Sequence, residues 1–117
     1  MEWLNLLGAA VTAIMGGIGL CAPSAAAALV GLEARTPPGR SEFRATYGGL
    51  FLALGAAPLI LGEPLLYAAA ALAWLGAAFG RLISIVIDRV SSTQNWLAAA
   101  FESAVGAVLI AGAPAAA

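Results

Sequence analysis

The sequence predicts an all-α integral membrane protein built as a four-helix bundle. Of its 117 residues, 62% are hydrophobic and only 9% are charged. Mean hydropathy is +0.98, well above the range of soluble domains. A helix needs roughly 20 mainly apolar residues to cross a bilayer, and the chain has four such stretches separated by short polar connections. We therefore expect a single transmembrane domain over residues 1–117, with no soluble domain.

The first predicted span covers residues 3–21. It ends before Pro23, because proline disfavours helical geometry in the residue that precedes it. Residues 24–32 are rich in alanine and form a short predicted helix that cannot cross a membrane alone. This piece either lies in the membrane interface or continues the first helix beyond a kink, and the sequence leaves both alternatives open.

Residues 33–42 are the only strongly polar stretch. The Pro-Pro-Gly at its centre predicts a loop without regular structure. Ser41 is the expected N-cap of the second span, residues 43–61. The remaining elements are a tight turn at 62–64, a third span at 65–87, a polar link at 88–95 and a fourth span at 96–112.

The basic residues predict the orientation of the bundle. The chain has five arginines and no lysine, and all five fall near the face that joins spans one to two and three to four. Because basic residues concentrate on the cytoplasmic side, we expect that face to be cytoplasmic and both termini outside (N-out/C-out). An alanine- and arginine-rich composition favours a bacterial inner-membrane, multi-pass protein. The arginines are Arg35, Arg40, Arg44, Arg81 and Arg89.

Small residues recur at the spacing that lets membrane helices approach closely. Four-residue steps relate Gly8, Thr12 and Gly16 in the first span, and similar steps occur in the second and third. We expect these positions to pack the bundle. The glycines concerned are Gly8, Gly16, Gly48, Gly49, Gly76 and Gly80.

Several function classes lack their chemical parts. With no histidine and one cysteine, a soft-metal site, Cys/His catalysis and dithiol redox chemistry are all excluded. A net charge of −1 without a basic run argues against nucleic acid binding. The glycine run at 16–19 follows no strand and precedes no Lys-Ser/Thr, so it is no phosphate loop. We expect no metal and no cofactor.

Two charged residues lie inside predicted spans, Arg81 in the third and Glu102 in the fourth. A charge inside a bilayer costs several kcal/mol unless it is paired, so each marks a candidate site. Each lies seven residues from the polar link, or about 10 Å below the same membrane surface. The two side chains are therefore expected at one depth.

Other polar side chains lie on matching faces near the cytoplasmic surface, and together they define a predicted polar pocket. Two inner arginines against one glutamate leave a surplus of positive charge, which a small anionic ligand or a lipid headgroup would neutralise. Alternatively, the Arg81–Glu102 pair only fastens two helices. The pocket residues are Arg44, Tyr47, Arg81, Ser84, Asp88, Asn95 and Glu102.

Two classes of function follow from these alternatives. The protein is either a membrane module that binds a lipid or small ligand, or an accessory subunit that packs against a larger membrane complex or against copies of itself. An enzyme with Tyr47 or Glu102 as acid/base is a third class, supported by no nucleophile or metal set. Membrane lipids are expected partners in every case.

Four segments carry a resemblance to a known family. They are Pro23, Ser-Glu-Phe-Arg-Ala-Thr-Tyr-Gly-Gly-Leu-Phe-Leu-Ala-Leu-Gly at 41–55, Gly-Arg-Leu-Ile-Ser-Ile-Val-Ile-Asp at 80–88, and Glu102. The chain resembles a bacterial four-helix membrane family of unknown function, loosely DoxX-like in architecture, and Arg-x-x-Tyr-Gly-Gly is its most specific segment. The resemblance implies the architecture and no activity. It also implies the positions of Arg44, Tyr47, Gly48, Gly49, Arg81, Asp88 and Glu102.

Overall fold

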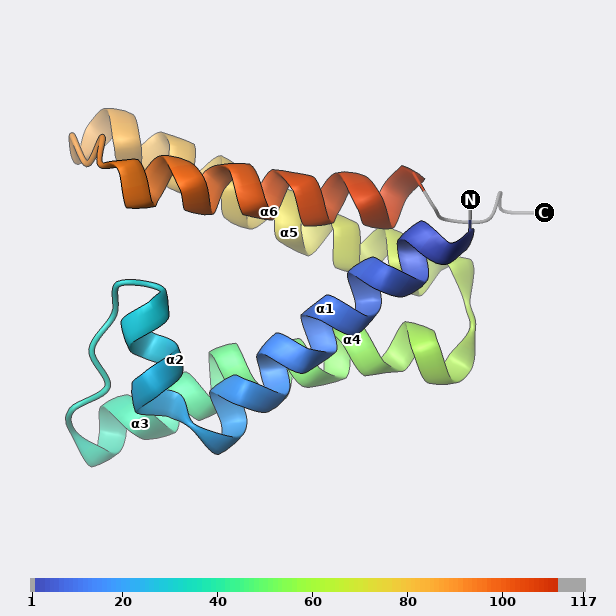
Figure 1. Cartoon of the computed structure of the whole chain (residues 1–117), viewed down its shortest axis with the longest axis horizontal. Helices are drawn as coiled ribbons and strands as arrows, with labels where there is room; N and C mark the ends of the chain where they lie inside the picture. Colours follow the sequence, from blue (N-terminus) through green and yellow to red (C-terminus); the bar gives the residue numbers. More distant parts are fainter. Residues whose placement is uncertain (1, 112–117) are drawn as a thin grey trace. The chain divides into compact units, whose positions relative to one another are not determined.

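The structure, a computed structural model, describes residues 2–111, and these residues contain helices and no strand (Figure 1). This agrees with the predicted all-α class. The elements are α1 (Glu2–Cys21), α2 (Pro23–Leu29), α3 (Pro37–Phe43), the π-helix η1 (Arg44–Gly49), α4 (Leu50–Leu61), α5 (Pro64–Ile87) and α6 (Thr93–Ala111).

Three helical stretches in the described residues are long and apolar enough to cross a membrane. They are Trp3–Cys21, Pro37–Leu61 and Pro64–Ile87, and they correspond to the first three predicted spans. The fourth predicted span falls on α6, which has 19 residues but begins with polar side chains and contains Glu102. Its role as a span stays a prediction, and residue 112 lies outside the described residues.

The chain divides into two compact units. The N-terminal unit is formed by residues 9–62, and the C-terminal unit by residues 2–8 together with 63–111. Each unit is described by itself.

The start of the second long helix differs from the prediction. The predicted loop at 33–42 is wrong in its second half, because α3 begins at Pro37 and continues through η1 and α4 to Leu61. Its N-cap is Thr36 and not Ser41, since the Thr36 hydroxyl accepts a hydrogen bond from the backbone N–H of Gly39 (3.0 Å). Prolines fit the first turn of a helix, where no N–H is needed.

Helix α2 is a separate helix, because the backbone leaves helical geometry at Ala22 (φ −135°, ψ 66°). The structure therefore breaks the first helix at this point, while an interfacial position for α2 stays a prediction. The helix packs against its own unit through Ala27, which is buried in a cluster with Ala34 and Phe43. The Ser24 hydroxyl donates to the Ala34 carbonyl (3.4 Å).

The helices of the N-terminal unit cross at backbone contact. A Cβ added to Gly16 of α1 would lie 2.1 Å from the backbone nitrogen of Leu52, and one added to Gly55 of α4 would lie 2.3 Å from that of Ala13. No side chain fits at either position, as the close-packing rule for small residues requires. Gly55 was not among the predicted packing glycines.

The other predicted packing glycines fall into two groups. Gly8 and Gly48 make close contacts, since an added Cβ would meet the Leu109 side chain at 2.8 Å in the first case and the Leu20 backbone at 2.9 Å in the second. At Gly49 the nearest atom would be 3.8 Å away. Around Gly76 and Gly80, no described atom other than the neighbouring residues and backbone of α5 itself would come within 4 Å.

The C-terminal unit is centred on α5 and α6, which lie side by side (Figure 1). Gly106 of α6 fits against Leu75 of α5, whose side chain would lie 2.7 Å from an added Cβ. Trp74 and Phe101 meet edge to face with their ring centroids 5.8 Å apart, a favourable geometry for aromatic rings. This packing sets the register in which charged residues of the two helices face one another.

Candidate functional site

The C-terminal unit contains a two-pronged ion pair between its two long helices. Arg81 of α5 donates from Nε to Oε1 of Glu102 in α6 (2.7 Å) and from Nη2 to Oε2 (3.0 Å). Two parallel bonds from a guanidinium to a carboxylate are the strongest form of this contact and also fix its geometry. The structure thus brings together the two charged residues that the sequence places at one depth.

Asn95 extends this pair toward the start of α6. Its side-chain oxygen accepts from Nη1 of Arg81 (2.8 Å), and its amide nitrogen donates to the Val90 carbonyl (2.9 Å). The backbone N–H of Asn95 also donates to the Ser92 hydroxyl (3.2 Å), an N-cap contact for the helix. We refer to Arg81, Asn95 and Glu102 as the fastening cluster, because it joins α5, α6 and the link between them.

Burial makes the pairing of this cluster energetically important. The Glu102 side chain is 11% exposed and that of Arg81 is 30% exposed. A charge in such surroundings is costly when it loses its partner, by about 3–5 kcal/mol for a fully buried pair. The cluster contains one cation and one anion, so this unit does not itself show the surplus of positive charge on which the anionic-ligand hypothesis depends.

Ser84 and Asp88 form a separate contact one turn further along α5. The Ser84 hydroxyl donates to a carboxylate oxygen of Asp88 (2.6 Å), and Asp88 is the C-cap residue of the helix. A carboxylate at a helix C-terminus meets an unfavourable dipole, so the hydroxyl compensates a local cost.

Arg44 belongs to the N-terminal unit, where it caps α1. Its guanidinium donates from Nη1 to the backbone carbonyl of Leu20. The last carbonyls of a helix lack intrahelical partners, and Pro23, which follows closely, has no N–H to offer. The neighbouring glycine contact between Gly48 and Leu20 brings η1 within reach. This geometry gives Arg44 a structural role.

Tyr47, also in η1, is part of a row of aromatic rings. It stacks on Phe43 with ring centroids 4.6 Å apart and an angle of 23°, and Phe51 follows at 6.0 Å. Arg44 and Tyr47 therefore lie in one unit and the other five predicted pocket residues in the other. The convergence of all seven on one pocket stays a prediction.

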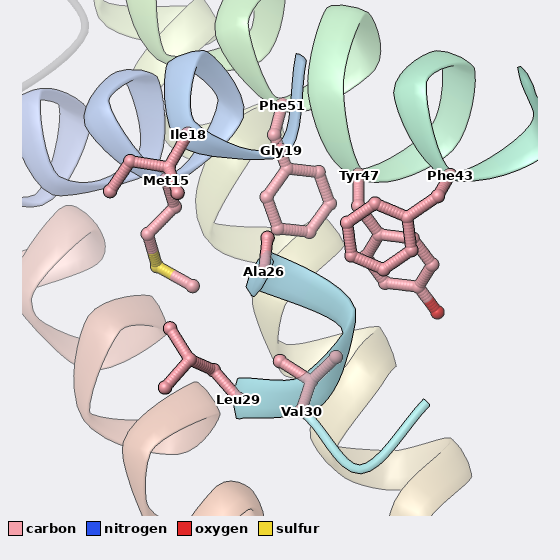
Figure 2. Close-up of a pocket in the computed structure, with 9 residues that line it drawn as sticks. All are labelled: Met15, Ile18, Gly19, Ala26, Leu29, Val30, Phe43, Tyr47 and Phe51. Carbon is pink, nitrogen blue, oxygen red and sulfur yellow. The ribbon is translucent and has the colours of Figure 1, made fainter. Parts of the chain in front are cut away.

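An apolar pocket in the N-terminal unit was missed by sequence reasoning. It has a volume of about 100 Å³ and is bounded by α1, α2 and the helical run from α3 to α4 (Figure 2). The spacing of its three aromatic rings, four residues apart, was the available signal. The lining residues are Met15, Ile18, Gly19, Ala26, Leu29, Val30, Phe43, Tyr47 and Phe51.

Among residues 2–111, no group of three or more Cys, Asp or Glu side chains could hold a metal ion. The described chain thus has two distinct features. The C-terminal unit contains the fastening cluster, whose polar groups pair with one another, and the N-terminal unit contains the apolar pocket. Together with three membrane-length apolar helices, they define a small all-helical protein of membrane type.

The chain belongs to the family DUF4345, a domain of unknown function, whose model matches residues 1–113. This agrees with the expected membership of a family of unknown function. The Arg-x-x-Tyr-Gly-Gly signature and the DoxX-like architecture stay predictions. Neither the curated proteins nor the solved structures contain a match to the chain.

Proposed function

We propose that this protein is a bacterial inner-membrane accessory subunit, in which the fastening cluster holds α5 and α6 together as a rigid hairpin that packs against other membrane helices. The observation that carries the proposal is the mutual pairing of Arg81, Asn95 and Glu102. Polar groups that neutralise one another across two helices set register and orientation, which is a structural task.

A packing face on α5 supports the second half of the proposal. Added Cβ atoms at Gly76 and Gly80 would have no neighbour within 4 Å, and Phe79 beside them is 66% exposed. Small residues at a four-residue spacing allow a second helix to approach the backbone closely. The proposed partner surface is therefore this face of α5.

The proposed membrane arrangement has four spans, with α6 as the fourth, and both termini outside. The arginine distribution supports it, since Arg35, Arg40 and Arg44 precede or begin the second span and Arg89 lies in the link before α6. Pairing with Arg81 supports the presence of Glu102 within a span, because an ion pair reduces the cost of the carboxylate in lipid.

Native mass spectrometry of the gently extracted chain tests this function. We expect a complex of fixed stoichiometry, with a partner subunit or with further copies, that dissociates in Gly76→Leu/Gly80→Leu. Gly17→Leu is the matched control, because Gly17 is also a helical glycine with no neighbour within 4 Å. A monomer in the wild type, or a complex that survives the double substitution, would contradict the proposal.

A second candidate is the binding of an anionic ligand or lipid headgroup at the polar residues. The partial exposure of the Arg81 side chain favours it, since 30% of that side chain stays accessible. Native mass spectra of the extracted protein also distinguish this candidate from the accessory-subunit proposal. A mass adduct present in the wild type and lost in a folded Arg81→Gln variant would favour ligand binding over a purely structural cluster.

A further inference from the structure

The apolar pocket of the N-terminal unit has the features of a binding site for a hydrocarbon chain. Its wall contains the stacked rings of Phe43 and Tyr47, and the Tyr47 hydroxyl points away from the pocket (Figure 2). Met15 of α1 and Leu29 of α2 extend toward one another across it (Figure 2). No lining side chain directs a charged group inward, so the pocket favours apolar groups over water.

The size of the pocket selects a slender ligand. At about 100 Å³ it is smaller than the ~150 Å³ apolar cavity that binds benzene in a well-studied case. Ring systems such as sterols are too wide for this space. An unbranched alkyl chain, which can enter end-first, fits it better.

The pocket opens toward the surroundings of the protein through apolar side chains. Leu29 at its rim is 79% exposed, and Ile18, Val30 and Tyr47 at the same rim are also exposed. In a chain with three membrane-length apolar helices, an exposed apolar rim of this kind is suited to contact with lipid. A lipid tail therefore reaches the pocket without crossing water.

Basic side chains lie close along the chain to the aromatic wall. Arg40 precedes Phe43 by three residues, and Arg44 directly follows it. The carbonyl that Arg44 reaches belongs to Leu20, the chain neighbour of Gly19 in the pocket wall. Arg44 is exposed and already donates to the Leu20 carbonyl, while its guanidinium carries further donors. A phosphate group attached to the bound chain would meet a cation at this end.

We infer that the pocket binds the acyl chain of a membrane phospholipid, with the lipid phosphate near Arg44. The combination of an apolar pocket, a lipid-facing rim and an adjacent arginine carries this inference. It is independent of the accessory-subunit proposal, which concerns α5 and α6.

Photolabelling tests the inference directly. The full chain is reconstituted in vesicles of phosphatidylglycerol that contain a small fraction of the same lipid with a diazirine near the end of one acyl chain. After illumination, peptide mapping locates the adducts. We expect them to concentrate on Met15, Leu29 and Phe43, compared with Ile60 of α4, which is 79% exposed, does not line the pocket and reports general lipid contact.

Substitution of Ala26, which lines the pocket, supplies the control. We expect Ala26→Phe to fill the pocket and to lower labelling of Met15 by about tenfold, equivalent to ~1.4 kcal/mol. Ala25→Phe adds the same side chain at an exposed neighbouring position that does not line the pocket, and should leave labelling unchanged. If Ala26→Phe fails to fold, Ala26→Leu replaces it.

Two results with the phospholipid probe would overturn the inference, and a third comes from a change of probe. One is uniform labelling of Met15 and Ile60 in the wild type, which would mean general lipid contact. The other is pocket labelling that persists in the folded Ala26 variant. Labelling by a diazirine fatty acid but not by the phospholipid would also contradict it, because the lipid phosphate is part of the proposed ligand.

Discussion

At the scale of single residues, the helices inside each unit are held together by different means. In the C-terminal unit, Arg81 of α5 and Glu102 of α6 form an ion pair. In the N-terminal unit, α1 and α4 cross at Gly16 and Gly55, where the absence of a side chain lets the two backbones meet. Both devices suit a membrane, where hydrophobic exclusion does not drive helices together. The ion pair and the glycine crossing each predict the effect of a particular substitution on stability.

Removal of one partner from the fastening cluster should destabilise the fold. We expect Arg81→Gln to lower the free energy of unfolding by about 2 kcal/mol, less than the full cost of a buried pair because Arg81 is partly exposed. Replacement of both partners, Arg81→Met with Glu102→Leu, should restore most of this loss, since no charge is then left unpaired. Unfolding of the detergent-solubilised chain, followed by circular dichroism, measures both.

An added methyl group at the helix crossing should be poorly tolerated. Gly16→Ala would place a Cβ 2.1 Å from the Leu52 nitrogen, so α1 and α4 must separate, at a cost of about 2–3 kcal/mol. Gly17→Ala, one residue along the same helix and without a neighbour, should change stability by less than about 0.5 kcal/mol. Equal effects of the two substitutions would contradict the observed crossing.

At the scale of elements, the end of α1 and the π-helix η1 depend on one another. Arg44 supplies a donor to the Leu20 carbonyl, and Gly48 lets the two backbones approach. A π-helix is rare and commonly marks a position where packing or function requires it. Here it accommodates a segment that meets α1 through the Arg44 guanidinium and through the backbone of Tyr47 and Gly48.

Loss of the arginine cap should loosen the last turn of α1. We expect Arg44→Gln to raise amide hydrogen exchange at Leu20 and Cys21 by about tenfold, because a hydrogen bond from a charged donor contributes about 1.5–3 kcal/mol. Arg40→Gln is the control, since Arg40 donates instead to the Arg35 carbonyl. In that variant, faster exchange should be confined to residues 33–36.

At the scale of the whole molecule, the predicted orientation can be tested by chemical access. In a Cys21→Ser background, we expect Glu63→Cys to react with a membrane-impermeant maleimide added to intact spheroplasts. Ser91→Cys, in the link between α5 and α6, should react only after lysis. An epitope added to the C-terminus should be accessible from outside, as a fourth span through α6 requires. The reverse pattern would contradict the arginine-based orientation.

How much of the structure the sequence predicts depends on how far apart in the chain the interacting residues lie. The relative depth of Arg81 and Glu102 followed from the constant rise per residue of an α-helix. The start of α3 was mispredicted although its signal was present, because Thr36 followed by two prolines is also a helix start. Thr36 and Ser41 are both favourable N-cap residues, so residue type alone does not show which of them begins the helix.

The Arg44 contact and the apolar pocket could not be predicted from the periodicity of single helices. The pairing of Arg44 with a carbonyl 24 residues earlier depends on how α1 and η1 cross. The pocket likewise depends on Ala26 lying opposite the row of rings, which requires α2 to fold back after Ala22. Helical patterns describe the faces of single helices, whereas these contacts arise from the meeting of three elements.

The ion pair between α5 and α6 also has a consequence for biosynthesis. Arg81 precedes Glu102 by 21 residues, so in a chain inserted during translation the guanidinium reaches the membrane before its counter-charge does. An arginine at the centre of a span opposes insertion by about 2.5–3.5 kcal/mol. Arg81 lies nearer one end of α5, so its cost is smaller, and until α6 arrives the apolar residues of α5 must offset it alone. With α6 as the proposed fourth span, its arrival pairs the guanidinium with a carboxylate and lowers this cost, so completion of the hairpin would be the step that retains both helices in the bilayer.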